Sequence, residues 1–266
     1  MKQKLNITIN SAVLYILAFL LTTILHELTH AVFGLLNHSD PVLYHNAVNH
    51  LSTDSLSISQ KVLIALAGPV ASLIQGIIIG IIYLKSRKQG LMRLFLLWFS
   101  VLGLSNFLGY LMTGPIFKNG DIGKVFLLLN IPLFLQILVA IIGAAILTFI
   151  AYKLTRPFLN FSYEEQWVNS QQARKNFSFH IIILPWLIGS FIVSLLYLPV
   201  VAIVSIIYPV TSGMIFIFPW KNAQRIENVA LSKNKQIGKI SILSIVILAL
   251  LIIVFRFVLA PGIQLF

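Results

Sequence analysis

Long apolar runs separated by short polar segments dominate this sequence. A helix needs about 20 mostly apolar residues to cross the hydrocarbon core of a bilayer. Runs of that kind predict seven membrane-spanning helices, at residues 10–35, 61–84, 91–113, 122–152, 180–198, 200–219 and 239–259. Prolines interrupt the fifth and sixth runs, on either side of the turn near Pro199. These two could instead form one kinked span and a re-entrant segment.

The composition agrees with a chain whose main solvent is lipid. Hydrophobic residues make up 58% of the chain and charged residues only 10%, whereas a typical soluble domain has about 25% charged residues. We therefore expect an all-α, polytopic integral membrane protein with about seven transmembrane helices and no cleavable signal peptide. The absence of cysteine excludes disulfides, cysteine metal ligands and thiol nucleophiles.

The cationic residues separate into two sets along the predicted spans. If the N-terminus is cytoplasmic, 15 of the 19 Lys and Arg residues fall on the cytoplasmic side. The outer side then holds Lys61, Lys118, Lys124 and Arg256. This asymmetry predicts a multi-pass protein of the cell membrane with a cytoplasmic N-terminus. Because the cations form short clusters between apolar runs, we expect the lipid bilayer, and no nucleic acid, as a partner.

The few acidic residues point to one chemical site. The chain has seven of them, and only Glu27 and Asp121 lie within or at the edge of an apolar run. A carboxylate in hydrocarbon is costly unless it is paired or bound to a metal, so a carboxylate at such a position is a functional candidate.

Residues 26–30 read His-Glu-Leu-Thr-His. On a helix, His26 and His30 are four residues apart and share one face, so both imidazoles can bind one ion. Glu27 is rotated about 100° from His26 and can reach a metal-bound water without being a ligand. This is the pattern of zinc hydrolases, in which the glutamate acts as general base. Three ionisable residues inside an apolar helix have no cheap structural explanation, which favours a metal site over chance.

A hydrolytic zinc site has three protein ligands and one open position. Asp121 is the candidate for the third ligand, because it follows a break rich in Gly, Pro and Asn at residues 114–120. A helix N-cap is the alternative role for Asp121. The remaining candidates are His38, His45 and His50, which we expect to be loop histidines near the membrane interface.

Further polar and small residues within the spans could belong to the same site. Gly68-Pro69 breaks the hydrogen-bond ladder of its helix and frees a carbonyl to face the site. Asn106 is an amide in an apolar span and needs a partner, either substrate or an oxyanion, or a neighbouring helix. Small residues every four positions predict a ridge for close helix packing; they are Gly68, Ser72, Gly76 and Gly80.

These motifs resemble those of the site-2 protease family of intramembrane zinc metalloproteases. Residues 26–30 match its His-Glu-x-x-His motif, residues 67–72 resemble its Gly-Pro motif, and Gly120-Asp121 resembles its motif around the third ligand. Ser72 replaces an Asn of the family and Ile122 replaces a Gly, so the chain resembles a divergent, bacterial-type member.

The resemblance implies a three-helix metalloprotease core within residues 1–152 and additional transmembrane helices within 153–266. Combined with the residues, it predicts an intramembrane zinc endopeptidase that cleaves membrane-spanning or membrane-anchored proteins. One zinc ion would be bound by His26, His30 and Asp121, with Glu27 as the base. Substrate would lie near Asn106, Gly68 and Pro69, and the loop at 37–60 would hold it by strand addition. In familiar members the catalytic helix runs opposite to the direction that the charges predict here.

The same residues in the sequence also allow other functions. A catalytically silent relative would bind zinc and act as a membrane scaffold or chaperone. A metal transporter would use the same His, Glu and Asp as a transport site, although the sequence shows no inverted repeat. A membrane zincin that takes its last ligand from a Glu-x-x-x-Asp motif is not favoured, because no such motif follows.

Overall fold

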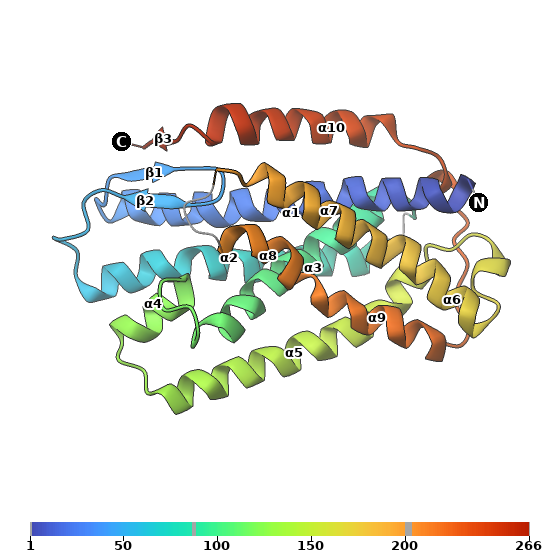
Figure 1. Cartoon of the computed structure of the whole chain (residues 1–266), viewed down its shortest axis with the longest axis horizontal. Helices are drawn as coiled ribbons and strands as arrows, with labels where there is room; N and C mark the ends of the chain where they lie inside the picture. The colour runs from blue at the N-terminus through green and yellow to red at the C-terminus, as the bar shows by residue number, and fades with distance from the viewer. Residues whose placement is uncertain (1, 87–88, 200–203, 266) are drawn as a thin grey trace.

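The computed structural model describes residues 2–86, 89–199 and 204–265, which form an array of long helices lying side by side (Figure 1). Within these residues six helices are long and apolar enough to cross a membrane. Four of them are α1 (Lys2–Leu36), α2 (Ile58–Lys85), α3 (Leu91–Thr113) and α5 (Leu133–Leu159). The structure thus agrees with the predicted helical membrane protein of several spans, whereas the predicted count of seven and the three-helix core stay predictions.

Two of the six spanning helices contain a π-helical turn. Gln171–Leu196 consists of α6 (Gln171–Ser178), a π-helical turn at Phe179–Ile183 and α7 (Leu184–Leu196). The turn stands directly before Pro185, whose missing N–H such a turn accommodates. Ile242–Leu259 consists of α10 (Ile242–Ile253) and a π-helical turn at Val254–Leu259.

The fourth span was predicted at residues 122–152, and its predicted first residue is wrong. A short helix, α4 (Asp121–Leu128), is followed by a break, and the spanning helix α5 begins only at Leu133. Asn130 adopts a left-handed φ of 51°, as residues that end a helix often do. Pro132 supplies no N–H and disfavours helix at the residue before it, so it separates α4 from α5.

The predicted span at 200–219 is not a continuous helix in the part that the structure describes. Residues 200–203 lie outside the described residues, and the remainder forms α8 (Val204–Ser212), a 3₁₀ turn at Met214–Phe216 and α9 (Ile217–Asn222). Carbonyls exposed by these breaks accept hydrogen bonds from α7, including Pro209 O from Ser190 Oγ at 2.7 Å. Ser194 of α7 also donates to Ile206 O at 2.8 Å, so α8 runs along α7. The end of the segment lies against α6, because Arg174 donates to Ala223 O and Gln224 O, each at 3.2 Å.

The connections gather at two ends of the array (Figure 1). The N-terminus and the connections α2–α3, α5–α6 and α9–α10 lie at one end, and the C-terminus, the α1–α2 connection and α4 lie at the other. Of the 15 cations predicted to share one side, Arg87 and Lys88 lie outside the described residues. The others lie in the first turns of α1 and α3, the last turns of α2 and α5, in α6 or α9, or in the connection from α9 to α10; they are Lys2, Lys4, Lys85, Arg93, Lys153, Arg156, Arg174, Lys175, Lys221, Arg225, Lys233, Lys235 and Lys239. Which side of the membrane the end with the N-terminus faces stays a prediction.

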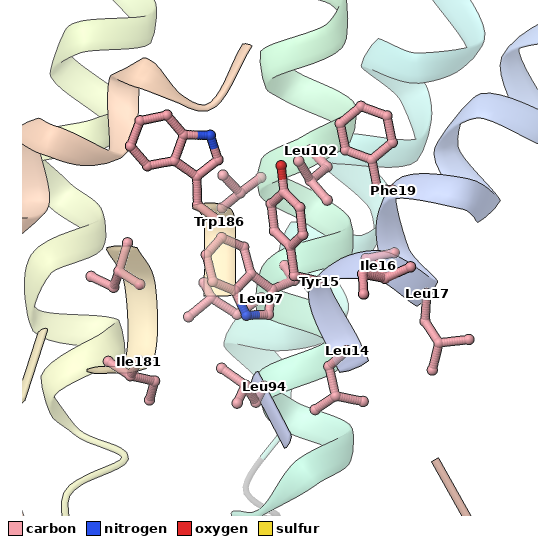
Figure 2. Close-up of a cluster of buried hydrophobic side chains, with 14 of the residues drawn as sticks. Leu14, Tyr15, Ile16, Leu17, Phe19, Leu94, Leu97, Leu102, Ile181 and Trp186 are labelled. Atoms are coloured by element: carbon pink, nitrogen blue, oxygen red, sulfur yellow. The ribbon is translucent and has the colours of Figure 1, made fainter. Parts of the chain in front are cut away.

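The helix α1 lies at the centre of the packing. Of its most apolar 18-residue stretch 78% is buried, against 11% for α5, so α1 is an interior helix and α5 mainly faces lipid. Figure 2 shows Tyr15 and Phe19 of α1 among Leu97 of α3 and Trp186 of α7. The Tyr15 hydroxyl lies 3.2 Å from Ser190 Oγ.

The buried cluster takes side chains from both halves of the chain. Residue 152, the predicted boundary between the two parts, lies within α5. The division of the chain at that boundary therefore stays a prediction.

A small sheet departs from the expected all-α fold. It lies at the end of the helix array that contains the C-terminus. β1 (Pro41–Leu43) pairs antiparallel with β2 (Val48–His50) on one side and with β3 (Ile263–Gln264) on the other. Leu43 lies opposite Val48 and Ile263. Both edges of β1 are therefore occupied, and a peptide strand could add only to β2 or β3.

The arrangement of the ends can be tested by labelling single cysteines in intact cells. Lys2→Cys and Lys233→Cys lie at the cation-rich end and should resist a membrane-impermeant thiol reagent, whereas Lys118→Cys at the other end should react. The native chain has no cysteine to interfere. Reaction at Lys2 and Lys233 with protection at Lys118 would reverse the orientation, and different behaviour of Lys2 and Lys233 would contradict the fold.

Candidate metal centre

Two imidazoles and one carboxylate converge where α1, α2 and α4 meet. His26 Nε2 lies 3.0 Å from Asp121 Oδ2, His30 Nε2 lies 3.3 Å from the same oxygen, and the two Nε2 atoms are 3.1 Å apart. Asp121 is 95 residues from His26 in the chain. The structure thus brings together the three residues predicted as metal ligands, and they form a group that could hold a metal ion.

Hydrogen bonds at the far side of each ring determine its tautomer. His30 Nδ1 lies 2.7 Å from Ile64 O, and because a carbonyl only accepts, Nδ1 carries the proton. His26 Nδ1 lies 3.1 Å from Ser72 Oγ, whose own proton is donated to Gly68 O at 3.1 Å. His26 Nδ1 is therefore also the donor, and both neutral rings present an Nε2 lone pair to Asp121.

The donor set requires a cation between its members. Two lone pairs and a carboxylate oxygen within about 3 Å of one another repel unless a proton or a metal ion lies among them. A proton on one ring removes the repulsion only in the contacts that this ring makes. A metal ion among the three groups would accept an electron pair from each of them. Ligands bound at about 2.0–2.2 Å around a tetrahedral ion lie about 3.3 Å apart, close to the separations found here. The residues present therefore fit a metal ion.

Gly68 allows α2 to approach this cluster. A Cβ atom at position 68 would overlap the His30 ring and would lie 2.7 Å from His26 Nε2. No side chain fits there, so only glycine allows both imidazoles to occupy the space. The predicted site residue Gly68 thus lies against the cluster.

Pro69 lies inside α2 beside Gly68 and is buried. The carbonyl that faces a site histidine is that of Ile64, five residues before Pro69. The N–H that Pro69 lacks would bond to the Ala65 carbonyl, so the carbonyl that faces His30 is not the one that the proline frees.

The ridge of small residues on α2 serves two neighbours. Ser72, one turn after Gly68, orients His26, as described above. Gly76 and Gly80 face α3 instead: a Cβ atom at Gly76 would lie 2.7 Å from Leu104 N, and one at Gly80 would lie 2.9 Å from Ser100 Oγ. Only the first half of the ridge belongs to the site, and the second half provides helix packing.

The N-cap of α4 is Gly120, and no side chain caps this helix. Asp121 is the first helical residue, and its carboxylate bonds to the two histidines. Its side chain is 25% exposed, whereas those of His26 and His30 are 3% and 7% exposed. The cluster is therefore open on the side of Asp121 and closed by the helices elsewhere.

Glu27 lies beside the cluster without joining it. It directly follows His26 on α1 and is half-buried. The three ion pairs of the described residues leave Glu27 out. Its predicted role as a proton acceptor stays a prediction.

Asn106 lies further along the α1–α3 interface. Its Nδ2 donates to the Tyr208 hydroxyl at 2.8 Å, which is the predicted interhelix hydrogen bond. Its Oδ1 is buried without a partner among the described residues and lines a small cavity that also contains Thr22, Thr23 and Ser105. A contact with substrate at this amide stays a prediction.

The loop histidines have other partners. His50 Nδ1 lies 2.7 Å from Ser39 Oγ, and burial, together with neighbouring positive charge, lowers the pKa of His50 to about 4. His45 Nε2 lies 3.2 Å from Tyr197 O. His38 adopts a left-handed φ of 57° beyond the end of α1. None of them belongs to the group of possible ligands found among the described residues.

Tyr110 of α3 was missed by the sequence analysis. Its ring stacks on His26 with a centroid distance of 5.2 Å and an interplanar angle of 9°. Its position four residues after Asn106 on one helix face is the only signal in the sequence that could have indicated it.

Replacing Asp121 by Asn should remove metal from the purified protein. An amide is a much poorer ligand than a carboxylate, so affinity should fall by more than the roughly 10–100-fold that outer-shell partners contribute. Metal per chain should be measured by elemental analysis, with Asp54→Asn, an exposed loop residue, as the control. Wild-type metal content in Asp121→Asn would exclude Asp121 as a ligand.

Gly68→Ala should displace the imidazoles and so reduce both metal content and melting temperature. Overpacking of this kind costs about 1–3 kcal/mol of folding free energy. Gly109→Ala on α3 is the matched control, because a Cβ atom there meets nothing within 4 Å. If Gly68→Ala kept metal and stability as well as Gly109→Ala does, the close approach of α2 would be disproved.

Comparison with protein-family models, with curated proteins and with solved structures finds no match for this chain. The functional interpretation therefore depends on the geometry of the metal centre itself.

Proposed function

We propose that this protein is an intramembrane zinc endopeptidase. The observation that carries the proposal is the convergence of His26 Nε2, His30 Nε2 and Asp121 Oδ2 within 3.3 Å of one another, with Glu27 beside them. The tautomers point both Nε2 lone pairs at one position, as ligands of a single ion require.

The donor set supports zinc as the ion. Two imidazoles and one carboxylate are the protein ligands of many hydrolytic zinc sites, where the fourth position stays open. The opening at Asp121 provides room for such a position. When bound, zinc acts as a Lewis acid and makes water a competent nucleophile at neutral pH.

The residues of the chain have distinct roles in this reaction. His26, His30 and Asp121 hold the ion, and Ser72 and the Ile64 carbonyl orient the two imidazoles. Glu27 accepts a proton from the attacking water and passes it to the amine of the departing peptide. Asn106 and the Tyr110 hydroxyl are the nearby polar groups that could contact the substrate backbone.

The depth of the site supports a membrane substrate. His30 stands six residues before the end of α1 at Leu36, about 9 Å along the helix axis. A peptide bond must therefore enter the helix array to reach the cluster. Membrane-spanning or membrane-anchored proteins meet this condition, because they already lie at that depth.

The proposal predicts that Glu27→Gln abolishes cleavage but retains zinc. Loss of a general base lowers turnover by roughly 10²–10⁴-fold, while the three ligands are untouched. Fragments of membrane proteins should be compared by mass spectrometry between cells that express wild type and Glu27→Gln, with zinc per chain measured in parallel.

Three outcomes would contradict the proposal. Equal fragment patterns with full zinc content would favour a scaffold that binds zinc without catalysis. Zinc flux into liposomes that contain the purified protein would favour a transporter. Another metal in place of zinc would reject the zinc assignment.

A further inference from the structure

A second polar cavity lies at the opposite end of the helices from the metal centre. Its volume is about 80 Å³, and because roughly 10–15 Å³ of such space holds one water, it can hold a group of several heavy atoms. It lies where α2, α3 and α5 meet the segment before α10, and its lining includes Tyr83, Arg93, Asn160 and Ser232. The proposed proteolysis makes no use of this cavity.

Among the described residues that line the cavity, Arg93 is the one cation, and it has no carboxylate partner. The ion pairs of the described residues do not include Arg93. Its guanidinium instead lies over the Tyr83 ring, 4.9 Å from the centroid, which fixes its position on the cavity wall. Arg93 therefore presents donors for an anionic group, and a guanidinium matches the oxygens of a phosphate well.

A second polar residue, Asn160, borders the cavity. Asn160 Oδ1 is buried and has no hydrogen-bond partner among the described residues. An unsatisfied buried carbonyl is costly, so the ligand should carry a hydroxyl as well as an anion. Gln89, also on the wall, ties the cavity to the segment before α10, because its Oε1 accepts from Ser232 Oγ at 3.0 Å and from Lys233 N at 2.7 Å.

The cavity lies at the depth of lipid headgroups. α2 ends at Lys85, α3 begins at Leu91 and α5 ends at Leu159, so the lining residues stand at or just beyond the ends of three spans. Leu84 and Met92, next in sequence to lining residues, are 77% and 69% exposed and offer apolar surface to acyl chains. Cationic residues gather at the same end, and basic pockets between spans are typical headgroup sites.

We propose that this cavity binds the headgroup of an anionic phospholipid of the phosphatidylglycerol type. The phosphodiester lies against the Arg93 guanidinium, and a glycerol hydroxyl donates to Asn160 Oδ1. This site is independent of the metal centre and of the proposed proteolysis.

Lipid binding by the full chain tests the proposal. Purified protein in a neutral detergent should be titrated with short-chain phosphatidylglycerol, short-chain phosphatidylcholine and free glycerol phosphate, and bound lipid counted by native mass spectrometry. We expect one phosphatidylglycerol per chain, held on the order of tenfold more tightly than phosphatidylcholine. Free glycerol phosphate should bind weakly, because it lacks the acyl chains. Glycerol phosphate binding as tightly as the lipid would overturn the lipid assignment in favour of a soluble phosphate ester.

Two substitutions and one control locate the site. Arg93→Gln removes the cation and should reduce phosphatidylglycerol binding by about tenfold. Asn160→Asp conserves shape but adds a negative charge, and should also reduce it. Lys153→Gln removes a cation from the same half of the chain, one that lies over Phe149 and does not line the cavity, and should bind lipid as wild type does. The melting temperature of each variant, compared with that of wild type, reports that the variant is folded. Unchanged binding by folded Arg93→Gln and Asn160→Asp, or equal binding of the two lipids by wild type, would overturn the proposal.

Discussion

The contact among His26, His30 and Asp121 is the constraint on which the rest of this structure depends. Three electron-pair donors at 3.0–3.3 Å from one another repel in a low-dielectric environment, and a cation converts this repulsion into binding. The arrangement requires that α1, α2 and α4 meet at one point. Gly68 supplies the space for α2, and the break at Pro132 releases α4 from the spanning helix, so that Asp121 can face α1.

The central position of α1 supports this contact from the other side of the molecule. Buried polar groups along α1 find partners on elements from the second half of the chain, among them Ser11 with Ile181 O at 2.7 Å and Asn10 with Ile237 O at 2.8 Å. Each bond satisfies a group that would otherwise be unpaired in an apolar interior. The C-terminal helices therefore hold α1 in place and thereby fix the histidines that it carries.

The two ends of the helices carry different chemistry. At one end, the candidate metal centre and the small sheet lie in a region where acids and imidazoles occur together. At the other end, cations predominate and the cavity beside Arg93 lies among the ends of three spans. An asymmetric distribution of this kind orients a protein in its membrane, because the cationic end interacts with anionic headgroups.

The sequence by itself determined those features that depend on local backbone geometry and on composition. The period of the helix placed His26 and His30 on one face and Glu27 beside them. The apolar runs predicted α3 at its observed bounds, four further spanning helices with shifts at their ends, and α5 with a start that was too early. Hydropathy alone could not distinguish the interior helix α1 from the lipid-facing helix α5, because a side chain in lipid and one in the protein interior are equally apolar. Only the tertiary structure decided that Asp121 reaches the histidines across 95 residues, that Ser72 and Ile64 select their tautomers, and that Tyr110 stacks on His26. These contacts join different helices, and their geometry depends on how closely the helices pack, which no local pattern encodes.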